Sequence, residues 1–233
     1  MKNKHLWLAT TAIALFGAAP QASADGLFVS VFGGMNFQQD LSGRLATTTP
    51  SFLDYDLDPD NGFVLGGAIG TELDKWVNGL KAEVEVSYRR NDIVGDMFST
   101  QGGSHTHTGA IYANHSTFAI MANVWYEINA GSKIKPYVGG GVGWARSHWE
   151  MAITSETGSG IYLSTDTDNS GFAWQLGLGF NYEVDPGVDV GLGYRYLVGP
   201  RNSSDFRGNH QTYSTALDNE NHAVMVNLTI ETN

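Results

Sequence analysis

The sequence predicts an all-β protein, an eight-stranded antiparallel up-and-down transmembrane β-barrel. Three observations lead to this fold class. Eight short stretches rich in glycine and aromatic residues follow one another along the chain. Each is about as long as the roughly 9–11 residues that a tilted strand needs to cross a bilayer. An export signal precedes them, and long and short links alternate between them. We therefore divide the chain into a signal peptide at 1–24 and one barrel domain at 25–233.

The first segment has the three parts of a secretory signal peptide. Lys2 and Lys4 supply its positive charge, 6–16 is an apolar run, and 22–24 is an A-x-A cleavage site. The apolar run is too short for a membrane-spanning helix, which needs about 20 apolar residues. We therefore expect export, with cleavage after Ala24.

Composition and charge narrow the functional classes. The chain has 29 glycines and no cysteine, so it offers neither disulfides nor thiol chemistry in an oxidising compartment. Its formal charge is −11, and because two of its 13 basic residues lie in the signal, the mature chain carries −13. An acidic chain argues against nucleic acid as a partner, because nucleic acid binds to a basic face.

The eight stretches alternate with a period of two. In 172–183 every even position is large and apolar, and the odd positions are small or polar. Alternate residues of a strand face opposite sides of the sheet. An apolar outer face with small residues inside suits a narrow barrel, although a soluble sandwich would alternate in the same way. The predicted strands are 27–35, 63–71, 80–89, 118–127, 138–144, 172–183, 188–196 and 222–230.

The first two predicted strands are less regular than the other six. In the first strand, Phe28 and Phe32 oppose three aliphatic residues, so its outward side is ambiguous. In the second, Val64 and Ala68 blur the polar side. Aromatic residues gather at strand ends throughout the chain, as in the girdles of outer-membrane barrels. They are Tyr88, Tyr126, Tyr137, Trp144, Phe172, Tyr182, Tyr194 and Tyr196.

The links between the strands alternate in length. Short turns are expected at 74–79, 129–133 and 185–187, where residues such as Pro and Gly favour turns. Outer-membrane barrels have short periplasmic turns and longer extracellular loops, so both termini are expected in the periplasm. Closing the sheet also removes the free edges that would aggregate. The four links expected as extracellular loops are 38–61, 91–116, 146–170 and 197–221.

Four segments carry a resemblance to a known family. They are 121–127, 135–145, 172–182 and 192–196. The chain resembles the small outer-membrane β-barrel proteins, which include the opacity-type surface proteins and the barrel of OmpA-like porins. That group contains adhesins, surface antigens, weak pores and proteins of no known activity. The resemblance also implies a terminal aromatic residue that the insertion machinery reads, whereas this sequence ends Glu231-Thr232-Asn233.

Inward-facing positions collect charged side chains. An eight-stranded barrel is just wide enough for side chains to fill it, and an unpaired buried charge is costly. We hypothesise that acids of the third strand, Glu85 above all, pair with Arg195 across the lumen and form a plug or gate. A filled core is favoured over a conducting pore. The predicted lumen charge network is Glu83, Glu85, Arg89, Glu127, Glu183, Asp189 and Arg195.

Other candidate sites are weaker. The alternating acids of 54–60 resemble the start of a calcium loop but lack its Gly and Glu, so a solvated acidic loop is favoured. Asp166, Asp168 and Asn169 form a shorter version of the same pattern. Histidines at 105, 107 and 115 give a weak zinc signal. The adjacent pairs His115-Ser116 and Ser147-His148 point to opposite faces, so neither forms a catalytic dyad.

The sequence therefore predicts a non-enzymatic surface protein of the outer membrane of a Gram-negative bacterium. Its long loops would serve adhesion, antigenic contact or envelope integrity. Two alternatives stay open: a small porin or channel for hydrophobic or small polar solutes, and a lipid-modifying barrel enzyme. Expected partners are outer-membrane lipid and lipopolysaccharide, the barrel-insertion machinery, and host or cell-surface ligands bound by the four loops. We expect no cofactor, metal or nucleic acid.

Overall fold

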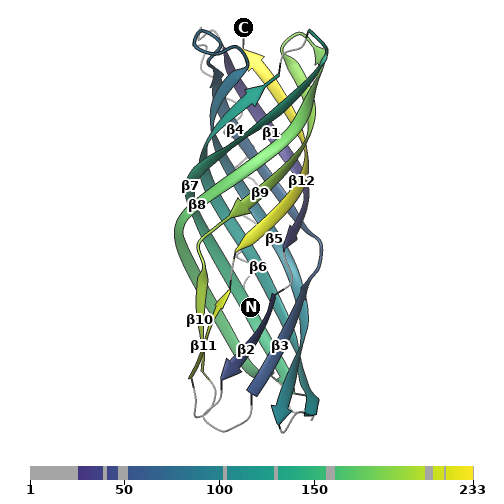
Figure 1. Cartoon of the computed structure of the whole chain (residues 1–233), viewed down its shortest axis with the longest axis vertical. Helices are drawn as coiled ribbons and strands as arrows, with labels where there is room; N and C mark the ends of the chain where they lie inside the picture. Colours follow the sequence, from purple (N-terminus) through teal and green to yellow (C-terminus); the bar gives the residue numbers. More distant parts are fainter. Residues whose placement is uncertain are drawn as a thin grey trace, which may run out of the picture.

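A computed structural model of the chain contains an antiparallel barrel (Figure 1). The predicted signal peptide and its cleavage site lie outside the described residues. Within the described part, eight of the strands close into one ring, which confirms the predicted fold class. The structure describes residues 26–38, 41–46, 52–101, 104–128, 131–155, 161–207, 212–217 and 219–232.

The barrel wall follows the order of the chain, and each strand pairs with its neighbours. The first strand pairs with the last over its whole length, from Leu27↔Thr232 to Gln38↔Asn221. This closure satisfies the backbone groups that a bilayer cannot. The eight wall strands are β1 (Leu27–Gln38), β4 (Gly62–Glu72), β5 (Leu80–Gln101), β6 (Ser104–Glu127), β7 (Ile134–Ser155), β8 (Ile161–Asp185), β9 (Val188–Val198) and β12 (Glu220–Thr232).

Short turns join β4 to β5, β6 to β7 and β8 to β9 at the end of the barrel where the C-terminus lies, at the top of Figure 1. Each of these turns contains a glycine in a conformation that residues with a Cβ rarely adopt: Gly79, Gly131 and Gly187 have φ angles of 83°, 70° and 75°. The Asp74 carboxylate holds the first turn by accepting a hydrogen bond of 2.7 Å from the Gly79 amide. Because short turns are periplasmic in barrels of this type, we call this the periplasmic end.

The opposite, extracellular end is built differently from the predicted loops. The links 91–116 and 146–170 are mostly strand, since β5 to β8 run for 22 to 25 residues each. The pairing of β5 with β6 continues as far as Gln101↔Ser104, and that of β7 with β8 as far as Thr154↔Ile161. The predicted loop bounds at these two links are therefore wrong.

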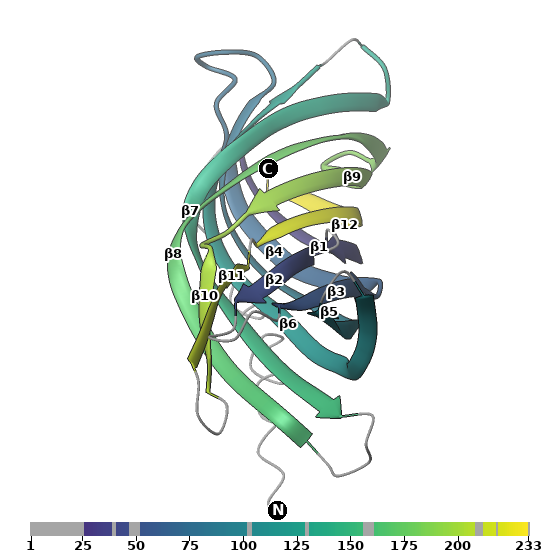
Figure 2. The same cartoon turned by 60° about the horizontal axis from the view of Figure 1, so that its bottom comes forward.

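The other two long links also contain strands. Within 38–61, β2 (Leu41–Ala46) pairs with β3 (Phe52–Pro59), and β3 continues beside β5 beyond the end of β4. Within 197–221, β10 (Asn202–Arg207) and β11 (Thr212–Leu217) form a separate two-stranded sheet. Figure 2 shows these elements gathered around the extracellular opening of the barrel.

The polar appearance of the long links has a physical cause. In the extracellular half of the wall, apolar residues such as Ile93, Ile111 and Trp149 face inward and are buried. The outward positions carry polar residues such as Arg90 and Asp168, because water replaces lipid outside the wall. The alternation therefore persists, but its apolar side reverses. A prediction that assumes apolar residues on the outer face therefore assigns these segments to loops.

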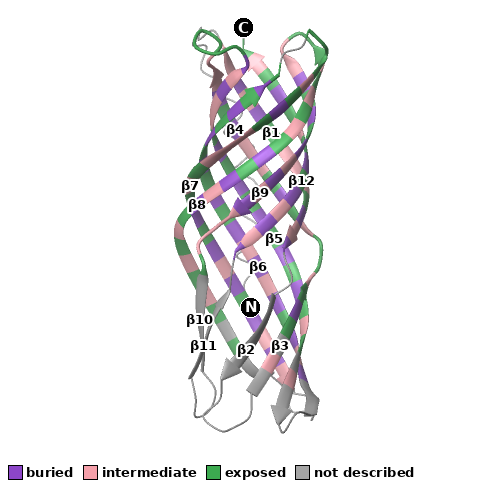
Figure 3. Ribbon diagram, viewed as in Figure 1, coloured by how far each residue is buried: buried purple, intermediate pink, exposed green. Residues whose placement is uncertain are grey.

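Closer to the periplasmic end the predicted alternation is confirmed (Figure 3). On β8 the even positions from Phe172 to Tyr182 face outward, whereas Ala173 and Gln175 are buried inside. The structure also resolves the ambiguity of β1, where Phe28 lies in the lumen with 2 % of its surface exposed. Val31 faces outward from the same strand.

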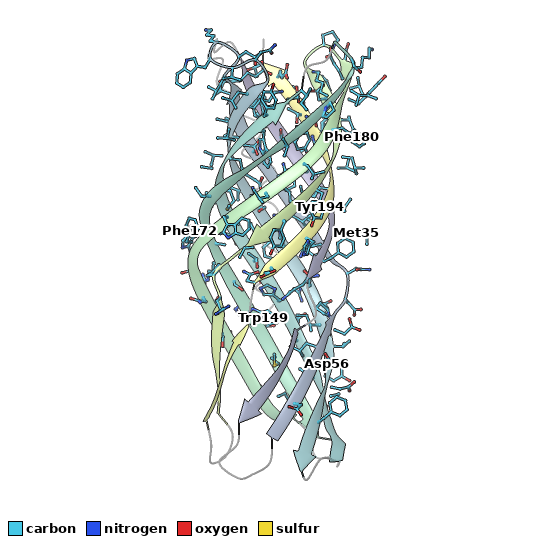
Figure 4. All side chains as sticks on the ribbon, in the orientation of Figure 1. Met35, Asp56, Trp149, Phe172, Phe180 and Tyr194 are labelled. Carbon is cyan, nitrogen blue, oxygen red and sulfur yellow. The ribbon has the colours of Figure 1, made fainter. Side chains whose placement is uncertain are left out.

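The apolar outer band ends at a row of aromatic residues, which we call the outer aromatic belt. Figure 4 shows Phe172 of this belt on the outside of the wall. The next outward residues toward the extracellular end are polar, among them Arg90, Ser116 and Arg146, so the membrane-facing band stops here. No helix among the described residues is long and apolar enough to cross a membrane. The belt consists of Phe63, Tyr88, Phe118, Trp144 and Phe172.

Candidate functional site in the barrel lumen

A lysine cluster closes the periplasmic end of the lumen. The Lys81 ammonium lies 3.1 Å from a carboxylate oxygen of Glu72, 3.3 Å from Glu231 and 3.6 Å from Glu127. These residues come from β4, β5, β6 and β12, so one cation joins four strands. Glu127 also accepts a hydrogen bond of 2.9 Å from Asn181. The lysine cluster thus fastens the last strand to the opposite wall.

A second lysine binds the remaining acids of the periplasmic end. Lys135 of β7 lies 3.1 Å from Glu183 and 3.4 Å from Asp189. Neither Lys81 nor Lys135 belongs to the predicted network. Lys81 could have been included, because it stands at an inward position of the third predicted strand. Lys135 stands just before the strand predicted from 138, so the alternation gave no signal for it.

The middle of the lumen is a hydrogen-bonded layer around two acids of β5. Asn123 Nδ2 donates to Glu83 at 2.9 Å and to Glu85 at 3.0 Å. Trp125 donates to Glu83 at 2.7 Å, and Gln175 donates to Glu85 at 3.1 Å. Amide and indole donors therefore stabilise both carboxylates, and the two acids do not depend on a cation for their hydrogen bonds.

Arg195 lies against aromatic rings instead of an acid. Its guanidinium carbon is 3.9 Å from the ring centroid of Trp125, and Nη1 donates to the Tyr137 hydroxyl at 3.3 Å. Gly177 leaves the space for it, since an added Cβ would lie 2.7 Å from Nη1. No carboxylate among the described residues lies within the 4.0 Å of an ion pair. The predicted pair of Glu85 with Arg195 is therefore not formed, because each group has other partners.

The other predicted cation is deeply buried. Arg89 is 1 % exposed and donates a hydrogen bond of 2.8 Å from Nη1 to Ser87 on the same strand. It forms no ion pair within the described part of the chain. The seven predicted lumen residues thus fall into separate groups: Glu127 with Lys81, Glu183 and Asp189 with Lys135, Glu83 and Glu85 with neutral donors, and the two arginines without acids in contact.

A cavity of about 60 Å³ lies in the periplasmic half of the lumen. It has space for a few water molecules. The lining combines aromatic rings with the charged groups of the lysine cluster and Arg195, so the cavity is chemically mixed. Its lining residues include Phe28, Phe32, Lys81, Trp125, Glu127 and Arg195.

A layer of neutral side chains fills the lumen beyond the outer aromatic belt, and we call it the outer polar layer. Asn36 donates to Asn91 at 2.6 Å and to Asn221 at 2.8 Å, which links β1, β5 and β12. Thr117 donates to Asn219 at 3.3 Å. All members are buried, and they are Asn36, Gln38, Asn91, His115, Thr117, Ser147, Asn219 and Asn221.

His115 lies within this layer and contacts a serine of the next strand. Its Nε2 is 2.7 Å from Ser147 Oγ, and its Nδ1 is 2.7 Å from Gln38 Oε1. The imidazole stacks on Trp149 with a centroid distance of 4.2 Å (Figure 4 labels Trp149). Adjacent residues on one strand cannot make such a pair, but residues on the same face of two paired strands can: Ser147 of β7 is opposite Thr117, two residues from His115 on β6. The sequence argument considered only neighbours along the chain and missed this pair.

The Ser147–His115 pair has the hydrogen-bond geometry of a nucleophile and its base, but it lacks the solvent access and the histidine pKa that catalysis requires. Ser147 is 0 % exposed and His115 is 2 % exposed. His115 lies beyond the outer aromatic belt, and burial lowers its pKa to about 3. An effective general base has a pKa near the working pH. The arrangement is therefore suited to packing rather than to proton transfer at neutral pH.

A charged cluster lies on the outside of the wall, on β7 and β8. Arg146 donates two hydrogen bonds, of 3.1 and 3.0 Å, to the Asp168 carboxylate, and the His148 imidazole lies 3.2 Å from the same group. Asp166 lies 3.5 Å from His148. The Arg146 guanidinium lowers the pKa of Asp168. Three donor groups of metal-ligating type thus meet here, but Arg146 already supplies the positive charge.

The other sequence candidates for metal binding do not assemble. Asp56, Asp58 and Asp60 are solvent-accessible on β3 or just after it, and they form no such donor group within the part of the chain that the structure describes. The side chains of His105 and His107 lie outside the described residues.

Comparison with known proteins agrees with this architecture. The family model named outer membrane protein beta-barrel domain matches residues 8–229. The chain belongs to this family. An outer-membrane location follows for the protein. Curated relatives are proteins from Brucella abortus and Brucella suis described as uncharacterized, 32 % identical over 85 residues. The match spans 35 % of this chain and 30 % of each relative, so it transfers no activity.

Solved structures of outer-membrane proteins share the fold of this family member. Neisserial surface protein A is 16 % identical, with a TM-score of 0.51 over 91 % of this chain and 100 % of that one. OprG from Pseudomonas aeruginosa is 14 % identical, with a TM-score of 0.51 over 89 % and 97 %. The outer membrane protease OmpT from Escherichia coli is 9 % identical, with a TM-score of 0.54 over 92 % and 99 %. At these identities the likeness concerns the fold alone.

Proposed function

We propose that this family member is a non-enzymatic surface barrel. The part of β5 to β8 beyond the outer aromatic belt, which we call the extracellular extension, contacts lipopolysaccharide and the surfaces of other cells. One observation carries the proposal: the lumen is packed with side chains at three levels, whereas the wall beyond the outer aromatic belt is long and polar on its outside. The interior therefore supports the structure, and the exterior is available for contact.

The packing of the lumen argues against a role in transport. The lysine cluster, the Glu83–Glu85 layer and the outer polar layer each join strands from several sides of the barrel. The cavity has a volume of about 60 Å³ and lies in the periplasmic half of the lumen, with the Glu83–Glu85 layer and the outer polar layer on its extracellular side. A solute would have to displace buried hydrogen bonds, which is costly for each donor or acceptor left unpaired.

The extracellular extension argues for contact. The four strands from β5 to β8 are about twice as long as crossing a bilayer requires. Their outward faces beyond the belt carry ions such as Arg90, Asp92, Arg146 and Asp168, close to where lipopolysaccharide headgroups lie. Loops on a rigid scaffold are the usual place for binding residues. Insertion would depend on the barrel-insertion machinery acting on β12, whose Glu231 forms an ion pair with Lys81.

Adherence of cells that display a shortened barrel tests the proposal. Gly95 pairs with Ile111, so replacing 96–110 by an Asn-Gly turn would shorten the β5–β6 hairpin without changing the register below it. We expect the variant to insert and remain heat-modifiable on gels but to lose adherence to epithelial cells or abiotic surfaces. Equal adherence of the two displays would contradict the proposal. The matched control is Leu178→Ile on the lipid-facing wall, which should leave adherence unchanged.

A small channel is the second candidate, and the cavity favours it. Arg195 lines the cavity, and no acid among the described residues forms an ion pair with it, so it could act as a selectivity residue for small anions. Uptake of small solutes by vesicles that contain the protein separates the candidates. Uptake at the rate of empty vesicles supports the surface barrel, whereas saturable uptake that Arg195→Ala abolishes supports the channel.

A further inference from the structure

The outer polar layer contains one group whose charge can change, and the layer has no means of compensating it. His115 is 2 % exposed, with both ring nitrogens within 2.7 Å of neutral partners, Gln38 and Ser147. Its ring stacks on Trp149 at 4.2 Å. In the imidazolium form both nitrogens carry hydrogen, and the oxygens of Gln38 and Ser147 can still accept. The hydrogen bonds thus tolerate protonation, and the cost lies in the charge itself.

Among the described residues, none of the side chains that face His115 inside the lumen is negatively charged. From β5 the facing residue is the amide Asn91, which pairs with His115 in the register. From β6 and β7 the neighbours are Thr117 and Ser147. The remaining members of the layer are amides, and no carboxylate in the described part of the chain lies within ion-pair distance of the ring. The charged group next to the layer inside the lumen is the cation Arg89 on β5. On the outer face of β7, His148 lies among the acids Glu150, Asp166 and Asp168, on the other side of the wall from His115.

The layer also crosses the lumen in its extracellular half, next to buried apolar residues such as Ile93 and Ile111. Its hydrogen bonds join the end of β1, the middle of β5, β6 and β7, and the start of β12. Gln38 is the last residue of β1, and Asn219 directly precedes β12. These are positions where the wall strands give way to the extracellular elements, so they can separate without disrupting the membrane-spanning part. Below the layer lie the Glu83–Glu85 layer and the cavity that Arg195 lines.

We propose that the outer polar layer is an acid-sensitive plug, in which protonation of His115 separates the layer and admits water to the lumen from the extracellular side. An imidazolium ion without an acid beside it is stable in water and costly in this layer. The open form therefore takes up a proton that the closed form excludes. Acid conditions outside the cell would then hydrate a lumen that is closed at neutral pH.

The pH dependence of opening follows from the difference in proton binding between the closed and open forms. The ordinary pKa of histidine is about 6.5, and burial lowers that of His115 to about 3. The closed layer keeps its full stability above about pH 6.5 and loses it as the pH falls toward 3. Over this window the ratio of open to closed layer rises by up to about tenfold per pH unit, because one proton is bound on opening.

The test uses the full mature chain in lipid nanodiscs and compares the wild type with His115→Asn and His148→Asn from pH 7.5 to 3.5. Amide hydrogen exchange, corrected for its intrinsic pH dependence, reports opening at residues 111–118. We expect exchange in the wild type and in His148→Asn to accelerate below pH 6.5 by more than tenfold. His115→Asn should show no acid-dependent acceleration, whatever its exchange rate at pH 7.5.

Two results would overturn the proposal. One is an exchange rate at 111–118 that does not change with acid in the wild type. The other is the same acid response in His115→Asn. If that variant fails to insert, histidine titration by NMR on the wild type decides: the plug requires one histidine ring, assigned to residue 115, that stays neutral above pH 4 in the closed form. A His115 signal that titrates near pH 6.5 with no change in exchange contradicts it.

Discussion

Lys81 of β5 and Glu231 of β12 form an ion pair of 3.3 Å across the periplasmic end of the barrel. The pair connects the final strand to a strand three positions away in the ring, with β1 and β4 between them. The ion pair therefore helps to hold β12 in place at this end of the ring.

Replacing Lys81 should destabilise the barrel strongly. Lys81→Met leaves Glu72, Glu127 and Glu231 together without their cation, and Glu127 is almost fully buried. Breaking a buried ion pair from one side costs about 3–5 kcal/mol, and we expect about 3 kcal/mol here because two of the acids reach solvent. Urea unfolding in lipid vesicles, followed by tryptophan fluorescence, measures the change in the free energy of unfolding.

Glu231→Gln is the matched control for that experiment. It removes one acid from a cluster that contains three, and Glu231 is partly exposed, so the loss should be below about 1 kcal/mol. An equal loss in both variants would mean that the pair with Glu231, rather than the whole lysine cluster, holds this end of the barrel.

Arg195 should matter for stability and not for conductance at neutral pH. Arg195→Gln removes the contact with Trp125, and a desolvated cation–π contact of this kind contributes about 2 kcal/mol. Because the guanidinium forms no ion pair that could open and close within the described residues, bilayer conductance should stay at its wild-type value. A rise in conductance with unchanged stability would contradict this expectation and support the hypothesis that Arg195 is part of a gate.

The lipid-facing side of β8 can be located by arginine substitution. Leu178 lies midway along the outward apolar positions between Phe172 and Tyr182, so Leu178→Arg should cost about 2–4 kcal/mol. Ser164 stands on the same face of the same strand but beyond the outer aromatic belt. Ser164→Arg should therefore leave the unfolding midpoint unchanged. Equal costs at both positions would contradict the membrane boundary drawn at the belt.

The exposed cluster on β7 and β8 should affect titration more than folding. Arg146 lowers the pKa of Asp168, so Arg146→Gln should raise that pKa toward its ordinary value. Carboxyl titration by NMR measures the change. Because both side chains are exposed, the unfolding midpoint should not move at pH 7. Asp168→Asn is the control that removes the titration altogether.

The sequence predicts the barrel well because the signal for it is local. Strand parity at 172–183 follows from alternation alone, and so does the inward side of Glu85 and Arg195. The same alternation fails in β1, where Phe28 fits either side, and in the extracellular strands, where the apolar side turns inward around Ile93 and Trp149.

The contacts inside the lumen join residues far apart in the sequence, and alternation along one strand does not predict which of these residues meet. Whether Arg195 meets Glu85 or Trp125 depends on the stagger of strands around the ring, which alternation leaves undefined. The pair of His115 with Ser147 depends on the register of β6 against β7. A search for neighbours along the chain finds His115-Ser116 instead, whose side chains point apart.

The packed lumen is the centre of this account, and planar-bilayer recording at pH 7.4 tests it most directly. With the mature chain inserted and its heat-modifiable migration verified, we predict that the membrane shows no stepwise current above that of the protein-free bilayer. Regular current steps that scale with the amount of inserted protein would contradict a lumen filled by the lysine cluster, the Glu83–Glu85 layer and the outer polar layer.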